Sequence, residues 1–118
     1  MNRARQKAQR YGAWAEWIAA WRLRVHGYRI LARRFKVPVG EIDIVAVKGD
    51  TLAIVEVKAR RDLDTAAESI SAHQRGRITR AALAFCQANT RYASASIRFD
   101  VMLVRPWRLP VHIVGAWQ

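Results

Sequence analysis

Two apolar runs joined by a short polar link place the strongest constraint on how this chain folds. The runs cover residues 39–47 and 51–58, are rich in β-branched side chains and carry few charges, so both are predicted to be β-strands. Gly49, at the first central position of the link, suits a two-residue hairpin turn. Apolar side chains fall on both faces of the runs, which predicts a sheet covered on both sides.

The expected hairpin register brings acidic side chains together. It places Asp43 opposite Glu56, and Glu41 opposite Lys58. Strict alternation also predicts that Ile42 shares a face with Ile44 and Ala46, with Asp43 on the other face. Two carboxylates that face each other across a ladder repel, so a compensating charge is expected, most simply a divalent cation. The alternative is a surface hairpin in which Glu41 and Lys58 form an ordinary cross-strand ion pair.

Asp43, Glu56 and Lys58 also match the D…(D/E)-x-K pattern of metal-dependent nucleases. Two carboxylates on adjacent strands can hold Mg²⁺ or Mn²⁺, which lowers the pKa of a bound water and neutralises charge on a phosphate. Glu56 and Lys58 are two residues apart and project from one face, so Lys58 can orient the water or stabilise a phosphate oxygen. The backbone carbonyl of Val57 is a further candidate ligand.

The charge of the chain indicates the kind of partner. The 118 residues carry a net charge of +12, and 17 of the 21 basic side chains are Arg, whose planar fork matches phosphate. The excess is spread along the chain, which favours a nucleic acid, with DNA expected, over an anionic membrane surface or an acidic protein. The single Cys86 excludes an internal disulfide and makes a reducing, cytoplasmic location the expectation. The chain lacks an apolar run long enough to cross a membrane.

The remaining pattern predicts one α/β domain over residues 1–118 with helices on a mixed sheet. In the first expected helix, Trp14, Trp17 and Trp21 fall on one side, and Gly12, Glu16, Ala19 and Leu23 fall on the other. One stripe should pack on the sheet, and the five Trp are expected mostly in the core; an exposed stripe would instead mark a dimer contact or a surface that stacks on bases. That first helix is expected at 3–26, ended by Gly27.

The other expected elements follow in chain order. They are a strand at 28–35, an irregular loop at 60–67, a helix at 68–88, a strand at 97–104, and a tail at 106–118 with a short edge strand at 111–114. The core residues expected in the second helix are Ile70, Ile78, Ala81, Ala82 and Phe85.

Three blocks of sequence resemble a known family. They are Gly40-Glu41-Ile42-Asp43, Val55-Glu56-Val57-Lys58 and Arg98-Phe99-Asp100, and together with residues 12–27 they resemble the YraN-like uncharacterised bacterial family over roughly residues 10–105. That family is similar to the PD-(D/E)XK nuclease superfamily, and most closely to archaeal Holliday-junction resolvases. The resemblance implies a restriction-endonuclease-like fold and a nuclease-type site for branched or damaged DNA.

The resemblance also implies roles for further residues. Glu16 would reach the site as a ligand of the metal or of its water, the alternative being a solvated helix acid. Gln74, where relatives often carry Lys, would contact a phosphate or a water. Asp100 is either a structural hydrogen-bond acceptor or a member of the site. Resolvase-like action would require two active sites and hence a homodimer.

Basic residues outside the acidic cluster are candidates for contact with nucleic acid. Arg60 and Arg61 begin the expected loop beside the site. Arg75, Arg77 and Arg80 form either a solvated helix face or a stripe that follows phosphates, and the net charge favours the stripe.

Three functions remain open from sequence. The first is a metal-dependent endonuclease, and the second is a non-catalytic nucleic-acid-binding module of the same fold. The third is an interaction module that docks on a DNA-repair protein through the Trp stripe, which an exposed patch at Trp14 and Trp17 would support.

Overall fold

The computed structural model describes residues 3–60 and 69–117, with side chains described from Gly12 onward. These residues form two helices and five strands, and a 3₁₀ turn precedes the fourth strand. The elements are α1 (Arg3–Val25), β1 (Arg29–Val37), β2 (Gly40–Lys48), β3 (Thr51–Ala59), α3 (Ala72–Ala88), η1 (Thr90–Tyr92), β4 (Ser96–Val104) and β5 (Val111–Trp117).

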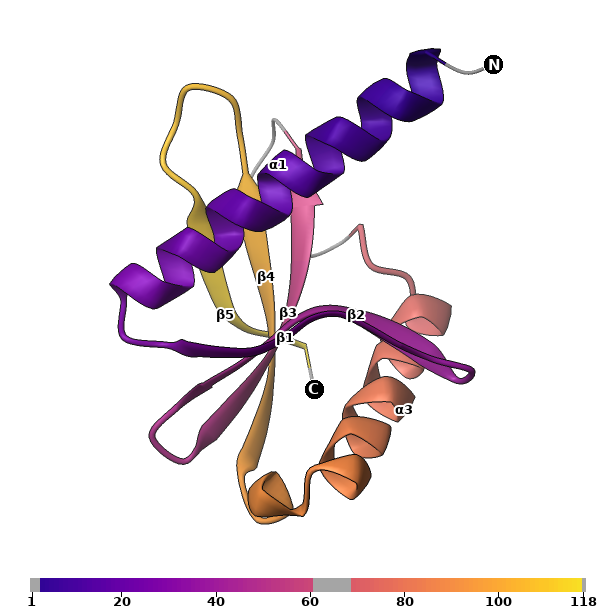
Figure 1. Cartoon of the computed structure of the whole chain (residues 1–118), viewed down its shortest axis with the longest axis vertical. Coiled ribbons are helices and arrows are strands. Elements are labelled where there is room, and N and C mark those ends of the chain that lie inside the picture. Colours follow the sequence, from indigo (N-terminus) through magenta and orange to yellow (C-terminus); the bar gives the residue numbers. More distant parts are fainter. Residues whose placement is uncertain (1–2, 61–68, 118) are drawn as a thin grey trace.

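The five strands form one mixed sheet in the order β1-β2-β3-β4-β5. Only β3 and β4 run parallel, while the other neighbours are antiparallel. Helix α1 crosses one face of this sheet and α3 packs on the other (Figure 1). The expected α/β class and the restriction-endonuclease-like arrangement are therefore confirmed. Over the described ranges, neither helix combines the length and the apolar composition that crossing a bilayer demands.

The ends of the elements follow local chemistry. Gly27 adopts a φ of +89° directly after α1, and the Tyr28 N–H bonds the Leu23 carbonyl at 3.0 Å, which closes the helix as expected. Helix α3 begins at Ala72, later than expected, because the Ser71 hydroxyl caps it by accepting the Gln74 N–H at 3.1 Å. Strands β1 and β5 continue beyond their expected ends, to residues 37 and 117.

Two apolar cores lie on the two faces of the sheet. The core under α3 holds all the helix residues that the sequence predicted, which are Ile70, Ile78, Ala81, Ala82 and Phe85. The core under α1 is built from small residues of the helix, which are Ala15, Ala19 and Ala20, together with Leu23. Small side chains allow the backbone of α1 to approach the strands closely, which positions anything carried on this helix face near the sheet.

The sequence prediction for tryptophan is wrong for four of the five residues, all of which the structure describes. Trp14, Trp17 and Trp21 are between 40% and 56% exposed, Trp107 is fully exposed, and Trp117 is buried. The opposite stripe of α1, which carries Glu16, is the one that packs on the sheet. Its small side chains fit the short helix-to-sheet distance, whereas three indole rings would hold the helix away.

Candidate functional site

The site forms where β2 and β3 diverge. Their ladder runs from Lys48↔Thr51 to Ile44↔Val55 in the expected register. The ladder ends there, so Asp43 and Glu56 do not form a further pair. Instead the Asp43 Oδ2 accepts the Val57 N–H at 2.8 Å. A carboxylate therefore takes the place of a backbone acceptor at the point where the two strands separate.

The expected alternation along β2 is wrong at Asp43. Ile44 packs in the core under α1, whereas Ile42 packs in the core under α3. On the neighbouring strand β1, Arg34 lies between two residues paired with Ile44 and Ile42 and has a φ of +54°. A left-handed conformation costs a residue other than Gly roughly 1 kcal/mol. Arg34 and Asp43 thus lie opposite each other at a point where the regular geometry of both strands is interrupted.

An open pocket of about 760 Å³ lies at this point, on the α1 side of the sheet. Its walls come from α1, β1, β2 and the end of β3. The lining residues are Gly12, Ala13, Ala15, Glu16, Arg34, Lys36, Glu41, Ile42, Asp43, Val57 and Ala59. The pocket therefore brings together Asp43 and Glu16, which are distant in sequence.

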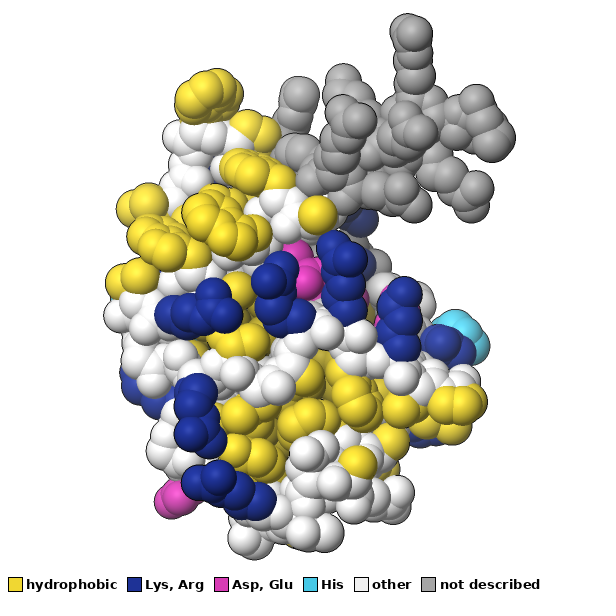
Figure 2. All heavy atoms as spheres, in the orientation of Figure 1, with side chains coloured by type: hydrophobic (Ala, Val, Ile, Leu, Met, Phe, Trp, Pro, Cys, Tyr) yellow, Lys and Arg dark blue, Asp and Glu magenta, His cyan; other side chains and the backbone are white. Residues whose placement is uncertain are grey.

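Glu16 is buried and faces this pocket, not solvent. Its Oε1 accepts the Nε–H of Arg33 at 3.1 Å, and its Oε2 accepts the Nε–H of Arg34 at 3.0 Å. Figure 2 shows acidic side chains lying between Lys and Arg side chains on this face. Glu16 is thus part of the site, while its role as a metal ligand stays a prediction.

The half-buried Asp43 and the buried Glu56 form an acid pair whose pKa values are both raised. Burial, the Asp43 charge and a hydrogen bond between the two carboxyls together raise the pKa of Glu56 to about 9. Burial likewise raises the pKa of Asp43, although the Val57 N–H and the hydrogen bond with Glu56 oppose the rise. Lys58 lowers both pKa values without reversing either shift.

The donor set of this pair fits a hard divalent cation. The Oε2 of Glu56 is buried and makes no hydrogen bond to any atom of the described ranges. A buried carboxylate oxygen without a partner is costly, and Mg²⁺ and Mn²⁺ prefer such oxygens. Among the described residues no three acidic, His or Cys side chains gather closely enough to form a metal cluster. Asp43 and Glu56 would therefore hold the ion, with water completing its coordination.

The remaining predicted site residues have different surroundings. Lys58 is half-buried near the end of β3, and neither it nor Glu56 is among the residues that line the pocket. Gln74 is half-buried in the first turn of α3, and it is not one of the described residues that line the pocket. Arg60 is exposed, and its guanidinium donates to the Ala59 carbonyl at 3.0 Å. Arg61 lies outside the described residues.

The three arginines of α3 lie on the helix that packs against the face opposite α1. The Arg75 guanidinium donates to the Ile70 carbonyl at 3.1 Å and lies 5.8 Å from the centre of the Trp117 ring. Arg77 and Arg80 are exposed. Arg75 thus makes structural contacts, and contact of all three arginines with phosphate stays a prediction.

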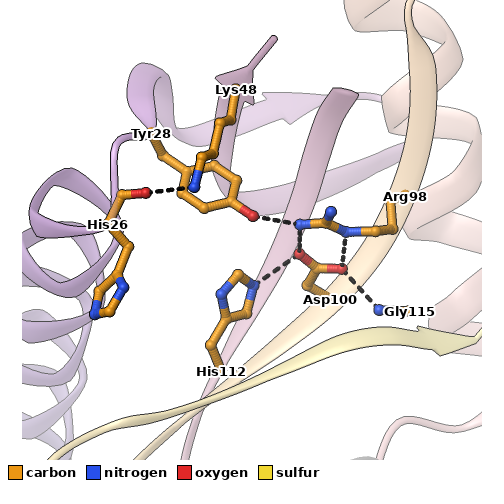
Figure 3. Close-up of polar contacts among 7 residues, drawn as sticks. All are labelled: His26, Tyr28, Lys48, Arg98, Asp100, His112 and Gly115. Carbon is orange, nitrogen blue, oxygen red and sulfur yellow. Dashed lines mark hydrogen bonds and ion pairs between the residues drawn. The ribbon is translucent and has the colours of Figure 1, made fainter. Parts of the chain in front are cut away.

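Asp100 forms a separate polar cluster under α1 (Figure 3). Its carboxylate accepts two hydrogen bonds from the Arg98 guanidinium, at 2.9 and 2.8 Å, and one from the Gly115 N–H at 3.0 Å. His112 Nε2 lies 2.8 Å from its Oδ2, and Arg98 also donates to the Tyr28 hydroxyl at 2.7 Å. Of the two roles left open by sequence, the structure supports the structural one.

Sequence reasoning missed the cations of β1 that surround the pocket, which are Arg33, Arg34 and Lys36. The signal was present, because three basic residues sit close together in a segment that reads as a strand next to the hairpin. A strand with adjacent charges cannot alternate cleanly, and the positive φ of Arg34 marks that irregularity.

Comparison with known proteins identifies the relatives of this chain. A model of the uncharacterised protein family UPF0102 matches residues 15–104. A UPF0102 protein of Paramagnetospirillum magneticum is 51% identical over 99% of this chain and 94% of its own length. A UPF0102 protein of Chelativorans is 50% identical over 93% and 89%, and one of Nitrobacter winogradskyi is 52% identical over 90% of both. The YraN-like resemblance is therefore confirmed.

Proposed function

Since the chain belongs to the uncharacterised protein family UPF0102, we propose a function from the site itself. The proposed function is metal-dependent endonucleolytic hydrolysis of phosphodiester bonds in nucleic acid, with DNA as the expected substrate. One observation carries the proposal, which is the buried Glu56 Oε2 that has no partner within the described ranges, next to Asp43. A buried carboxylate oxygen without a partner, beside a second carboxylate, suits the binding of a divalent cation.

The chemistry follows from the residues of the site. A bound Mg²⁺ or Mn²⁺ would supply a water of lowered pKa and would neutralise charge on the phosphate. Asp43 and Glu56 would hold that ion, and the Val57 N–H fixes the Asp43 carboxylate in place. Lys58 would hold the attacking water or donate to a phosphate oxygen.

The cations around the pocket suit a polyanionic substrate. Arg34 and Lys36 line it, and Arg33 lies beside them on Glu16. Glu16 holds both guanidinium groups in position, so its role on this proposal includes presenting them to phosphate. The net charge of +12 would raise the local concentration of nucleic acid around the whole domain.

A second candidate is a nucleic-acid-binding module without catalysis. It is favoured by the two arginines that occupy both oxygens of Glu16, which leaves Asp43 and Glu56 as the acids at hand for a metal. Such a module would bind nucleic acid in a salt-dependent manner and would not need Asp43.

The test is a cleavage assay with Mn²⁺ and with Mg²⁺ on single-stranded, duplex, flapped and four-way-junction DNA and on RNA. We expect cleavage by the natural chain and a loss of more than about 100-fold in Asp43→Asn, since even outer-shell partners of metals cost 10- to 100-fold. Asp50→Asn, in the exposed hairpin turn, is the matched control and should retain activity. If the natural chain cleaves none of these substrates while still binding them, the binding module is the correct account.

A further inference from the structure

The loop between β4 and β5 carries the most exposed aromatic side chain of the described residues. Trp107 is 102% exposed and Leu109 is 78% exposed. The sequence around them, Arg105-Pro106-Trp107-Arg108-Leu109-Pro110, alternates cationic and apolar residues between two prolines. Neighbouring exposed apolar side chains that form a patch, unlike single scattered ones, mark contact surfaces.

The backbone of this loop holds Trp107 in an unfavourable conformation. Trp107 has a φ of +61°. In the described part of the chain, two residues other than Gly have a positive φ, which are Trp107 and Arg34 in the pocket. A bulky side chain is rarely found in this region, and its cost is of order 1–3 kcal/mol. The stability of the fold does not explain a residue that is both strained and fully exposed. Contact of its ring with a binding partner does.

The loop starts at the same end of the sheet as the pocket. Strands β3 and β4 are parallel and remain paired up to Ala59↔Val104. Ala59 lines the pocket, and the loop begins one residue after Val104, about one strand spacing or ~5 Å away. In Figure 1 the loop extends beyond this end of the sheet, beside α1, and Figure 2 shows hydrophobic side chains gathered over both.

The charge of the loop identifies the kind of partner. Arg108 follows Trp107 and is exposed, whereas Arg105 is half-buried; the pocket adds Arg34 and Lys36. An exposed aromatic ring in a cationic segment matches a nucleic acid strand, in which bases stack and phosphates repeat. An acidic protein would use the cations but would not need a flat ring on a strained backbone.

We propose that Trp107 stacks on an unpaired base of a nucleic acid strand whose phosphate lies in the adjacent pocket, while Arg108 contacts a neighbouring phosphate. The inference rests on the proposed function and narrows its substrate class to strands with unpaired bases, either single strands or the open positions of flaps and branches. In a continuous duplex every base is already stacked, so Trp107 gains nothing there without unstacking a step.

Binding without metal tests this inference, because no cleavage then occurs. Anisotropy of labelled oligo(dT) and of its duplex with oligo(dA), in EDTA, gives the affinities of the natural chain, Trp107→Ala and Trp107→Phe. We expect Trp107→Ala to weaken binding to oligo(dT) about fivefold to 100-fold and binding to duplex less than about twofold. Trp107→Phe should retain most of the affinity for oligo(dT), and Arg108→Ala should lower the salt slope by about one ion.

Leu83→Ala is the matched control, because Leu83 is also an exposed apolar residue but lies on α3. It should leave both affinities unchanged. An equal loss on both oligonucleotides, or no loss in Trp107→Ala, overturns the inference. A third outcome also overturns it. If the natural chain binds phosphatidylglycerol vesicles, and Trp107→Ala abolishes that binding but leaves the affinity for oligo(dT) unchanged, the loop contacts a membrane surface instead.

The inference and the proposed function can fail separately. A chain that binds oligo(dT) through Trp107 and cleaves no substrate would keep the stacking contact and refute hydrolysis. A chain that cleaves DNA with Mn²⁺ and is indifferent to Trp107→Ala would do the reverse. Because the side chain of Trp107 is fully exposed, thermal unfolding of the variants should match that of the natural chain.

Discussion

Two buried acidic sites lie on neighbouring strands of the same sheet, and they are built in opposite ways. Asp100 on β4 has all of its hydrogen bonds supplied by protein groups, namely Arg98, His112 and the Gly115 N–H. Glu56 on β3 has a buried oxygen without any partner in the described part of the chain. Both acids pay for burial, and only one of them is compensated.

The pKa values of the two sites express this difference. Burial alone would raise the pKa of Asp100, but the hydrogen bonds from His112, Arg98 and the Gly115 N–H together hold that pKa below its usual range. At Glu56, burial and the neighbouring Asp43 both act upward and bring the pKa to about 9. Protein groups thus stabilise the charged form of Asp100, but they do not stabilise the charged form of Glu56 beside Asp43. Such a difference is expected if the Asp43 and Glu56 pair binds a cation.

The largest expected effect is on the stability of the fold after the same substitution at each site. Asp100→Asn should cost about 3 kcal/mol, because it leaves Arg98 and the nearly buried His112 without their anion. Asp43→Asn should cost less than about 1 kcal/mol, because the amide oxygen still accepts the Val57 N–H and one buried charge is removed. Urea unfolding in EDTA measures both.

Equal losses of stability in Asp43→Asn and Asp100→Asn would contradict the comparison, because both sites would then be structural. Asp50→Asn, on the exposed hairpin turn, serves as the reference for substitution at the surface and should stay within about 0.5 kcal/mol of the natural chain.

The next effect is a dependence of stability on pH with opposite sign at the two sites. The raised pKa of Glu56 means that its neutral form suits the fold, so its contribution is complete below about pH 4.5 and is lost as the pH rises through about 9. The lowered pKa of Asp100 means that its contribution is present above its unfolded value of about 4 and is lost in acid.

Comparison with Glu56→Gln isolates the alkaline effect. From about pH 6 to about pH 9, the metal-free natural chain should lose on the order of 3 kcal/mol of unfolding free energy relative to Glu56→Gln. Urea midpoints in EDTA across this range give the difference. Parallel curves for the two proteins would show that Glu56 is an ordinary ionised carboxylate.

Most of the fold could be predicted from the sequence, because the spacing of apolar residues and the positions of turn residues indicate its strands and helices. The strand pattern of the hairpin gave its register, and the apolar spacing of α3 gave its core. The sequence left open which stripe of α1 packs on the sheet, because both stripes are apolar, and the expectation that the tryptophans lie mostly in the core was wrong. The size of the side chains decides the matter, since Ala19 and Ala20 let the helix approach the sheet.

The site could be predicted only in part. The identity and proximity of Asp43 and Glu56 followed from register, and the inward face of Glu16 from helix spacing. The interruption at Arg34 and Asp43 did not follow, because a change of phase in two strands depends on their packing on both cores. The exposure of Trp107 was missed for a related reason, since the loop that holds it has no periodic pattern.

Titration of Mn²⁺ into the protein near pH 7 tests the central claim most directly. Calorimetry in two buffers of different ionisation enthalpy counts the protons released, and the proton on Glu56 must leave when the ion binds. We expect binding with release of about one proton in the natural chain and in Asp50→Asn, and loss of that binding in Asp43→Asn and Glu56→Gln. Absence of binding to the natural chain, or binding that Glu56→Gln leaves unchanged, would contradict the claim that Asp43 and Glu56 form a metal site.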